Sequence, residues 1–255
     1  MVPVMRELVR CWQHTRMIVL IALCAALYVS LLIPFKIAVL VPGITEIRPA
    51  AALPILFSIL FGPAAAWGAA FGNTIGDFFG TIGPGTLFGF LGNFMYGFIP
   101  YRIVRVYLKP EESLFSAKGW FVFLFGLFLA AAMCAIIIAM GIDFLGIVPF
   151  GFLAHTIFLN NFFVSLLLVP LLFRALDKRI RQMHLSYSQI EEPQEFSGFP
   201  LKGAGPVIFL LLLLLTYSVL MLPSMQQEIP LLSQNLKAFE LGAGIVLVLA
   251  ALLLL

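Results

Sequence analysis

One acidic side chain lies inside the long, almost uncharged stretch 49–100, where it belongs to a polar stripe. Asn73, Asp77 and Thr81 recur every four residues, so they share one face if the segment is helical. Asn93 lies on the next predicted helix and can face the same point. An ionisable group in hydrocarbon is costly and usually faces a protein interior, where it marks a substrate or ion path. The spacing therefore predicts a polar binding site that includes Asn73, Asp77 and Asn93.

Two further polar groups extend this candidate site. The loop before residue 49 carries Glu46 and Arg48, and we expect it to fold over the outer mouth of the bundle as a cap. A later apolar run carries a second polar patch, which comprises His155, Thr156, Asn160, Asn161 and Ser165.

Each of these residues also has a plainer interpretation. Membrane Asn side chains often bond across helices, for about 0.6 kcal/mol on average. Asp77 can be neutral and structural, and His155 can be satisfied at the membrane interface. Glu46 and Arg48 can simply pair at the surface.

The patterns that indicate catalysis or metal binding are missing from the sequence. The three cysteines are scattered, and neither a CxxC nor an HExxH motif occurs. His155 is the only histidine in a predicted span, and no nucleophile–base pair or paired acids lie at useful spacing. We therefore expect no enzyme activity, no metal, no cofactor and no nucleic-acid partner.

The composition defines the elements that must position these groups. The 255 residues are 62% hydrophobic and 11% charged, whereas soluble domains carry about 25% charged residues. An all-α protein that crosses the membrane several times is the prediction. The first apolar run, 17–34, lacks a cleavage site for a signal peptide and should remain as a helix.

The basic residues predict the number of crossings. Most of them fall in three segments, which the positive-inside rule assigns to the cytoplasm: 1–16, 101–118 and 174–202. Because the first two lie on the same side and the first helix supplies one crossing, the stretch 49–100 must supply one or three. A single helix of about 20 residues would leave about thirty apolar residues outside it, which favours three short helices. Six helices then precede residue 182 and two follow, with both termini cytoplasmic. The predicted helices are 17–34, 49–61, 64–81, 85–104, 119–141, 148–173, 204–223 and 239–255.

Three parts of the chain are distinguished on this basis. Residues 1–182 form the predicted six-helix binding domain, and the polar segment 183–202 reads as a cytoplasmic linker. Residues 203–255 carry two lipid-like helices, for which an anchoring or scaffolding role is natural.

Over residues 17–182 the chain resembles the substrate-binding S components of energy-coupling factor (ECF) vitamin transporters. The similar segments are IALCAALY, EIRPAAALP, FGPAAAWGAAFGNTIGD and PGTLFGFLGN. The resemblance implies a six-helix bundle that binds a vitamin or related micronutrient near the outer face. It also implies partnership with a transmembrane coupling subunit and two ATPase subunits, which hydrolyse ATP in place of the S component.

The resemblance also assigns roles to particular residues. In the family an alanine pair on the first helix contacts the coupling subunit; Ala22 and Ala26 match that pair, with Ala25 beside them. Family ligand contacts come from the first outer loop and the fourth to sixth helices. As ligand-binding residues, this family pattern therefore favours Glu46, Arg48, Asn93, His155 and Asn160 over Asp77.

The leading hypothesis is thus a substrate-specific subunit in a prokaryotic cell membrane that serves ATP-driven micronutrient import. One alternative is a stand-alone secondary carrier that uses Asp77 as an ion site, and another is a membrane scaffold without transport. The two extra helices can anchor the protein, contact a partner or hinder movement in the membrane. The sequence does not identify the substrate.

Overall fold

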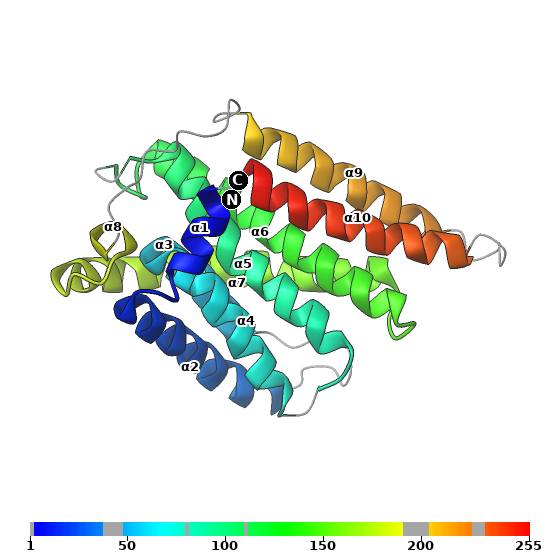
Figure 1. Ribbon diagram of the computed structural model, residues 1–255, viewed down its shortest axis with the longest axis horizontal. Helices are drawn as coiled ribbons and strands as arrows, with labels where there is room; N and C mark the ends of the chain where they lie inside the picture. The colour runs from blue at the N-terminus through cyan, green and yellow to red at the C-terminus, as the bar shows by residue number, and fades with distance from the viewer. Residues whose placement is uncertain (1–2, 38–47, 80–81, 110–111, 191–203, 226–232) are drawn as a thin grey trace.

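The computed structural model describes residues 3–37, 48–79, 82–109, 112–190, 204–225 and 233–255 (Figure 1). Within these ranges the chain forms helices and no strand. The outer loop that carries Glu46 lies outside the described residues, as does Thr81, the last residue of the predicted polar stripe.

The helices follow the predicted order closely. Their bounds are α1 Pro3–Arg10, α2 Thr15–Ile37, η1 Pro49–Ala51, α3 Ala52–Phe61, α4 Pro63–Asp77, α5 Gly85–Tyr107, α6 Ala117–Phe144, α7 Phe150–Gln182, α8 Tyr187–Ile190, α9 Gly205–Met225 and α10 Ser233–Leu254. Two short helices were not predicted: α1 within the basic N-terminal segment, and α8 within the segment interpreted as a linker.

The apolar stretch 49–100 divides at a glycine and a proline. Gly62 ends α3 with a φ of +59°, a left-handed backbone that favours glycine, and Pro63 opens α4. A Cβ built on Gly62 would lie 2.7 Å from the ring of Tyr187, so α8 closes against this turn. The break therefore separates α3 from α4 where one long helix would otherwise run.

Three described helices are long and apolar enough to cross a membrane: Thr15–Phe35, Ala117–Phe144 and the segment Phe150–Ile190. Shorter apolar helices cover Pro49–Phe61, Gly205–Met221 and Leu241–Leu254. The protein is thus an all-α membrane protein, as the composition predicts. The count of eight crossings stays a prediction, because α3 is short and the glycine-rich α4 and α5 are less apolar.

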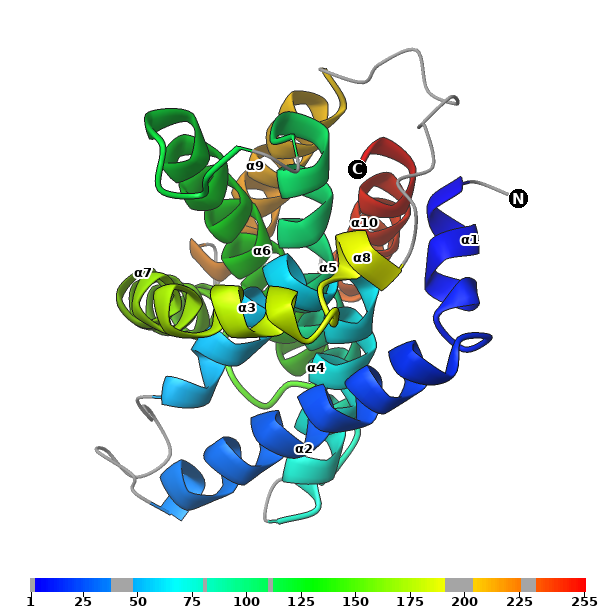
Figure 2. The same ribbon diagram turned by 90° about the vertical axis from the view of Figure 1, so that its left-hand side faces the viewer.

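Helices α4, α5 and α6 form the middle of the bundle (Figures 1 and 2). Helix α2 packs on α4, whereas α7 packs on α6 and also contacts α3. The hairpin of α9 and α10 lies against α6 and α7, on the other side from α2. The bundle has two distinct ends, which we call the Asp77 end and the Glu7 end after a residue in each.

Gly68, Gly72 and Gly76 recur every four residues on α4 and lie directly against α2. A Cβ on Gly72 would come within 2.8 Å of the Tyr28 ring, and one on Gly76 within 2.6 Å of Leu32. Gly68 meets the side chain of Cys24 in the same way. Small residues at four-residue spacing thus allow the close helix contact that their pattern predicts.

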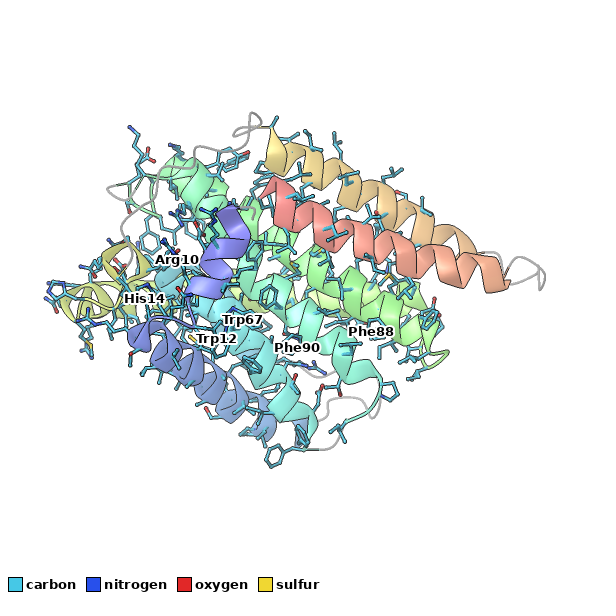
Figure 3. All side chains as sticks on the ribbon, in the orientation of Figure 1. Arg10, Trp12, His14, Trp67, Phe88 and Phe90 are labelled. Carbon is cyan, nitrogen blue, oxygen red and sulfur yellow. The ribbon has the colours of Figure 1, made fainter. Side chains whose placement is uncertain are left out.

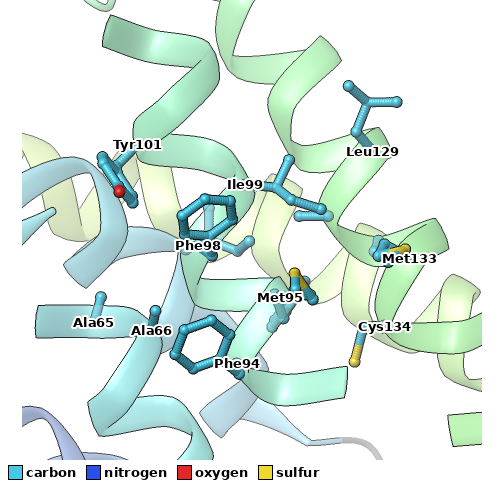
Figure 4. Packing of buried hydrophobic residues seen from close by; sticks show 14 of the residues in the cluster. Ala65, Ala66, Phe94, Met95, Phe98, Ile99, Tyr101, Leu129, Met133 and Cys134 are labelled. Atoms are coloured by element: carbon cyan, nitrogen blue, oxygen red, sulfur yellow. The ribbon is translucent and has the colours of Figure 1, made fainter. Parts of the chain in front are cut away.

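The contact between α4 and α5 is equally close. A Cβ on Gly97 would lie 2.7 Å from the carbonyl oxygen of Ala65, which is rigid backbone. Figure 4 shows Phe94 and Phe98 on the side of α5 that faces α4, and Met95 on the side that faces α6. This buried packing fixes the register of α5, which carries polar groups at both of its ends.

A charge network occupies the Glu7 end of the bundle. The carboxylate of Glu7, which is 8% exposed as a residue, lies 3.3 Å from Arg102 Nη1 and 2.8 Å from Arg105 Nη1. The Tyr101 hydroxyl also donates to Glu7, at 3.4 Å. We call Glu7, Tyr101, Arg102 and Arg105 the charge network; through them α1 is tied to the end of α5.

Two other elements join this network. Arg102 Nε donates to the backbone oxygen of Leu255 at 2.6 Å, which brings in the end of α10. Arg105 Nη1 lies 3.3 Å from the Tyr187 hydroxyl of α8. The basic residues that the positive-inside rule counts as surface charges are therefore partly structural here.

Aromatic contacts hold the turn between α1 and α2 against α4. Trp67 Nε1 donates to the Leu8 carbonyl at 3.2 Å, and the Trp12 and Trp67 rings lie 5.5 Å apart. Figure 3 shows both tryptophans, with Phe90 further along the same face. The N-terminal helix is therefore part of the packed structure.

Candidate functional site

Asn73 and Asp77 stand one turn apart at the end of α4. Asn73 is buried and its Nδ2 donates to Asp77 Oδ2 at 3.2 Å, while Asp77 is half-buried. The spacing predicted this shared face, and the carboxylate does turn toward a polar neighbour within the protein. Two of the predicted site residues are thus brought together.

Helix α5 adds the third predicted residue, Asn93. Its Nδ2 donates to the Gly89 carbonyl at 2.9 Å, and its Oδ1 accepts from the Tyr28 hydroxyl of α2 at 3.0 Å. A Cβ on Gly89 would lie 2.7 Å from Asn73 Nδ2, so only glycine lets α5 approach the α4 amide this closely. We call the set Tyr28, Asn73, Asp77 and Asn93 the amide cluster.

A second group of polar contacts lies between α5 and α7. The Tyr96 hydroxyl donates to the Asn161 carbonyl at 3.0 Å and lies 2.8 Å from Ser165 Oγ. Ser165 Oγ in turn donates to the Ala51 carbonyl of η1 at 3.1 Å. Asn161 Nδ2 lies 3.6 Å from the Cys134 sulfur of α6.

Arg48 lies beside the second group. Its backbone N–H donates to Asn160 Oδ1 at 3.2 Å, which joins the segment before η1 to α7. The two groups are neighbours where α5 meets α6, because a Cβ built on Gly92, next to Asn93, would lie 3.2 Å from the Cys134 carbonyl. Side chains from α2, α4, α5, α6 and α7 thus meet in this part of the bundle.

The structure does not bring His155 to these residues. It is exposed, and its Nε2 lies 2.8 Å from the Tyr217 hydroxyl of α9, while its Nδ1 contacts the Gly151 carbonyl. His155 and Asn160 are five positions apart on α7 and therefore point in different directions. His155 joins the bundle to the C-terminal hairpin.

The alanines of α2 divide between two faces. Ala22 and Ala26 are exposed, as are the larger neighbours Val19 and Leu23, whereas Ala25 is buried beside the α4 glycines. Among the described helices, the C-terminal hairpin packs against α6 and α7 and not on this face of α2. Ala22 and Ala26 therefore stay exposed within the described part of the chain.

Three contributors to these contacts were absent from the predicted site: Tyr28, Tyr96 and Cys134. The sequence does contain a signal that places Tyr28 against α4. Tyr28 shares a helix face with Cys24 and Leu32, at the same four-residue spacing as the α4 glycines. Tyr96 and Cys134 had none, since an isolated Tyr or Cys in an apolar run predicts packing equally well. No cluster of metal-binding side chains occurs within the described ranges.

The sequence profile of a family described as QueT transporter matches residues 18–178, which is more than half of the chain. No curated protein and no solved structure matches.

Proposed function

The chain belongs to the QueT transporter family of ECF S components, and on this premise we propose that its amide cluster binds a queuosine precursor. As a family member the protein is a substrate-binding subunit of a micronutrient transporter. This membership favours import through an ECF complex over the stand-alone carrier and the scaffold. The observation that carries the site assignment is the Tyr28–Asn93 bond beside the Asn73–Asp77 pair.

The chemistry of the amide cluster suits such a ligand. Queuosine is built on a 7-deazaguanine ring, whose edge presents neighbouring N–H donors and a carbonyl acceptor. An ionised carboxylate accepts two hydrogen bonds side by side, and an amide both donates and accepts. In the proposed complex Asp77 accepts from the ring N–H groups, and Asn93 or Asn160 bonds to the carbonyl.

Binding exchanges internal hydrogen bonds for bonds to the ligand. Asn73 donates to Asp77, and Tyr28 donates to Asn93, so these donors and acceptors pair with one another in this structure. A ligand replaces these bonds without loss when its donors reach Asp77 or Asn93 and its acceptors reach the displaced Asn73 amide or Tyr28 hydroxyl. Arg48 and Glu46 belong to the proposed site as residues of the capping segment.

Equilibrium binding of a 7-deazaguanine precursor base to the purified full chain tests this proposal. Asp77→Asn should lower affinity about tenfold or more, because a buried charge-assisted hydrogen bond is replaced by a weaker one. Asn93→Leu should weaken binding similarly, and Asp177→Asn is the matched control on the exposed Asp177–Arg181 pair. Unchanged affinity in both site variants would overturn the assignment.

We also propose that α2 is the coupling surface. The exposed pair Ala22 and Ala26 lets a helix of the transmembrane coupling subunit approach closely. In the proposed complex two ATPase subunits supply the energy for import. In this arrangement residues 1–182 are the binding domain, 183–202 the linker and 203–255 the anchor. The Glu7 end and both termini face the cytoplasm.

Ala26→Trp should abolish co-purification with the coupling subunit and leave precursor binding within twofold of the unsubstituted protein. Exposed Leu211→Trp on α9 is the control on a face that the proposed partner does not use. If the Ala26 variant still co-purifies with the coupling subunit, the coupling surface lies elsewhere on the protein. Uptake that persists without ATPases and stops with the ion gradient would instead support a stand-alone carrier.

A further inference from the structure

A basic cleft lies at the start of α2, at the Glu7 end of the bundle. Its volume is about 280 Å³, and the described residues that line it are His14, Thr15, Arg16 and Ile190, the last residue of α8. Two of these four side chains are basic and none is acidic. Figure 3 shows His14 in this region, near Arg10 of α1.

The cleft lies where the apolar span begins. The span of α2 is Thr15–Phe35, so Arg16 stands at the boundary between the polar terminus and the hydrocarbon. Directly after it, Ile18 is 40% exposed and Val19 59% exposed. Trp12 precedes the cleft and is also exposed, as is common for tryptophan at the level of lipid headgroups.

We propose that this cleft binds the phosphate of an anionic phospholipid. Arg16 supplies the complementary charge, and its guanidinium, the His14 ring and the Thr15 hydroxyl supply hydrogen-bond donors. The volume lies just below the range of about 300–1,000 Å³ for small-molecule pockets, which suits a headgroup and not a whole lipid.

The exposed apolar face beside the cleft selects a lipid over free phosphate. An acyl chain that runs from the headgroup along α2 meets Val19 and then Leu23, both exposed. Inorganic phosphate makes no use of this face. Basic residues next to a span are moreover attracted to the negative surface of a membrane.

Native mass spectrometry of the full chain in mixed micelles tests the proposal, with phosphatidylglycerol and phosphatidylcholine at equal concentration. The protein should retain phosphatidylglycerol at least fivefold more than phosphatidylcholine. Arg16→Gln should reduce that retention about fivefold, the effect of one basic residue at a membrane surface. Lys178→Gln, an exposed cation at the same end but outside the cleft, should leave it unchanged.

Two further measurements distinguish binding of a whole lipid from binding of phosphate alone. Val19→Ser should weaken phosphatidylglycerol retention without changing the thermal stability of the protein, because it removes only the acyl contact. Inorganic phosphate should not displace the lipid. Equal retention of both lipids, equal losses in the Arg16 and Lys178 variants, or full displacement by phosphate would each overturn the proposal.

Discussion

The two ends of the bundle use polar residues in opposite ways. At the Glu7 end, one buried carboxylate is enclosed by Arg102, Arg105 and Tyr101 of α5. At the Asp77 end, a half-buried carboxylate on α4 has a neutral amide donor, Asn73, beside it. The bundle therefore carries a salt-bridged contact at one end and a set of exchangeable hydrogen bonds at the other.

This difference separates stability from binding. Removing one partner from a buried ion pair leaves an uncompensated charge, so the charge network cannot open cheaply. Neutral hydrogen bonds contribute about 1 kcal/mol each and can be exchanged for bonds to a ligand. We infer that the Glu7 end holds the helices together while the Asp77 end accommodates substrate.

The largest expected effect is at the Glu7 end. Glu7→Gln removes the negative charge that Arg102 and Arg105 both contact and should lower the free energy of unfolding by about 3 kcal/mol. Thermal unfolding in detergent measures this loss. Precursor affinity at 20 °C should stay within twofold, because the amide cluster is untouched.

The exposed pair Glu112–Lys118 provides the matched control. Bonds from the Lys109 backbone and from Lys118 lower the pKa of Glu112, but the pair is solvent-exposed and screened. Glu112→Gln should leave the unfolding temperature unchanged. An equal loss in the Glu7 and Glu112 variants would remove the distinction between the two ends.

A smaller effect on both stability and precursor affinity is expected at the contact between α2 and α4, which includes Tyr28. Gly72→Ala places a Cβ 2.8 Å from the Tyr28 ring and 3.0 Å from the Ala25 carbonyl. It should cost about 1–2 kcal/mol in stability and weaken precursor binding, since Tyr28 must move away from Asn93. Gly83→Ala is the control, because a Cβ there meets nothing within 4 Å. Normal binding by the Gly72 variant would separate Tyr28 from the site.

The smallest effect is expected at the hairpin. Tyr217→Phe removes the bond to His155 and should lower the unfolding free energy by about 0.6 kcal/mol, with no change in precursor affinity. A double-mutant cycle with His155→Phe measures the coupling directly. A clear loss of affinity in either variant would return His155 to the binding site.

The helices were predictable from the sequence because Gly62, Pro63 and the basic segments mark their ends. The four-residue glycine spacing of α4 is likewise a local pattern that is typical of close helix contacts. The match over 18–178 confirms the resemblance to S components. These signals are local or follow from the membrane, so one sequence is enough to detect them.

The polar contacts were only partly predictable. Asn73 and Asp77 share a helix turn, which spacing alone reveals. The Tyr28–Asn93 bond joins residues 65 positions apart, and the direction of His155 depends on the rotation of α7. The role of Arg102 as a buried partner of Glu7 was likewise hidden, since the positive-inside rule counts charges without pairing them.

The most direct test of the central claim is an experimental structure of the full chain with a 7-deazaguanine precursor bound. The account predicts ring density against Asp77 and Asn93, between α4, α5 and α7, with the Glu7–Arg102 pair intact. A ligand seated elsewhere, with the Asn73–Asp77 and Tyr28–Asn93 bonds unchanged, would contradict it.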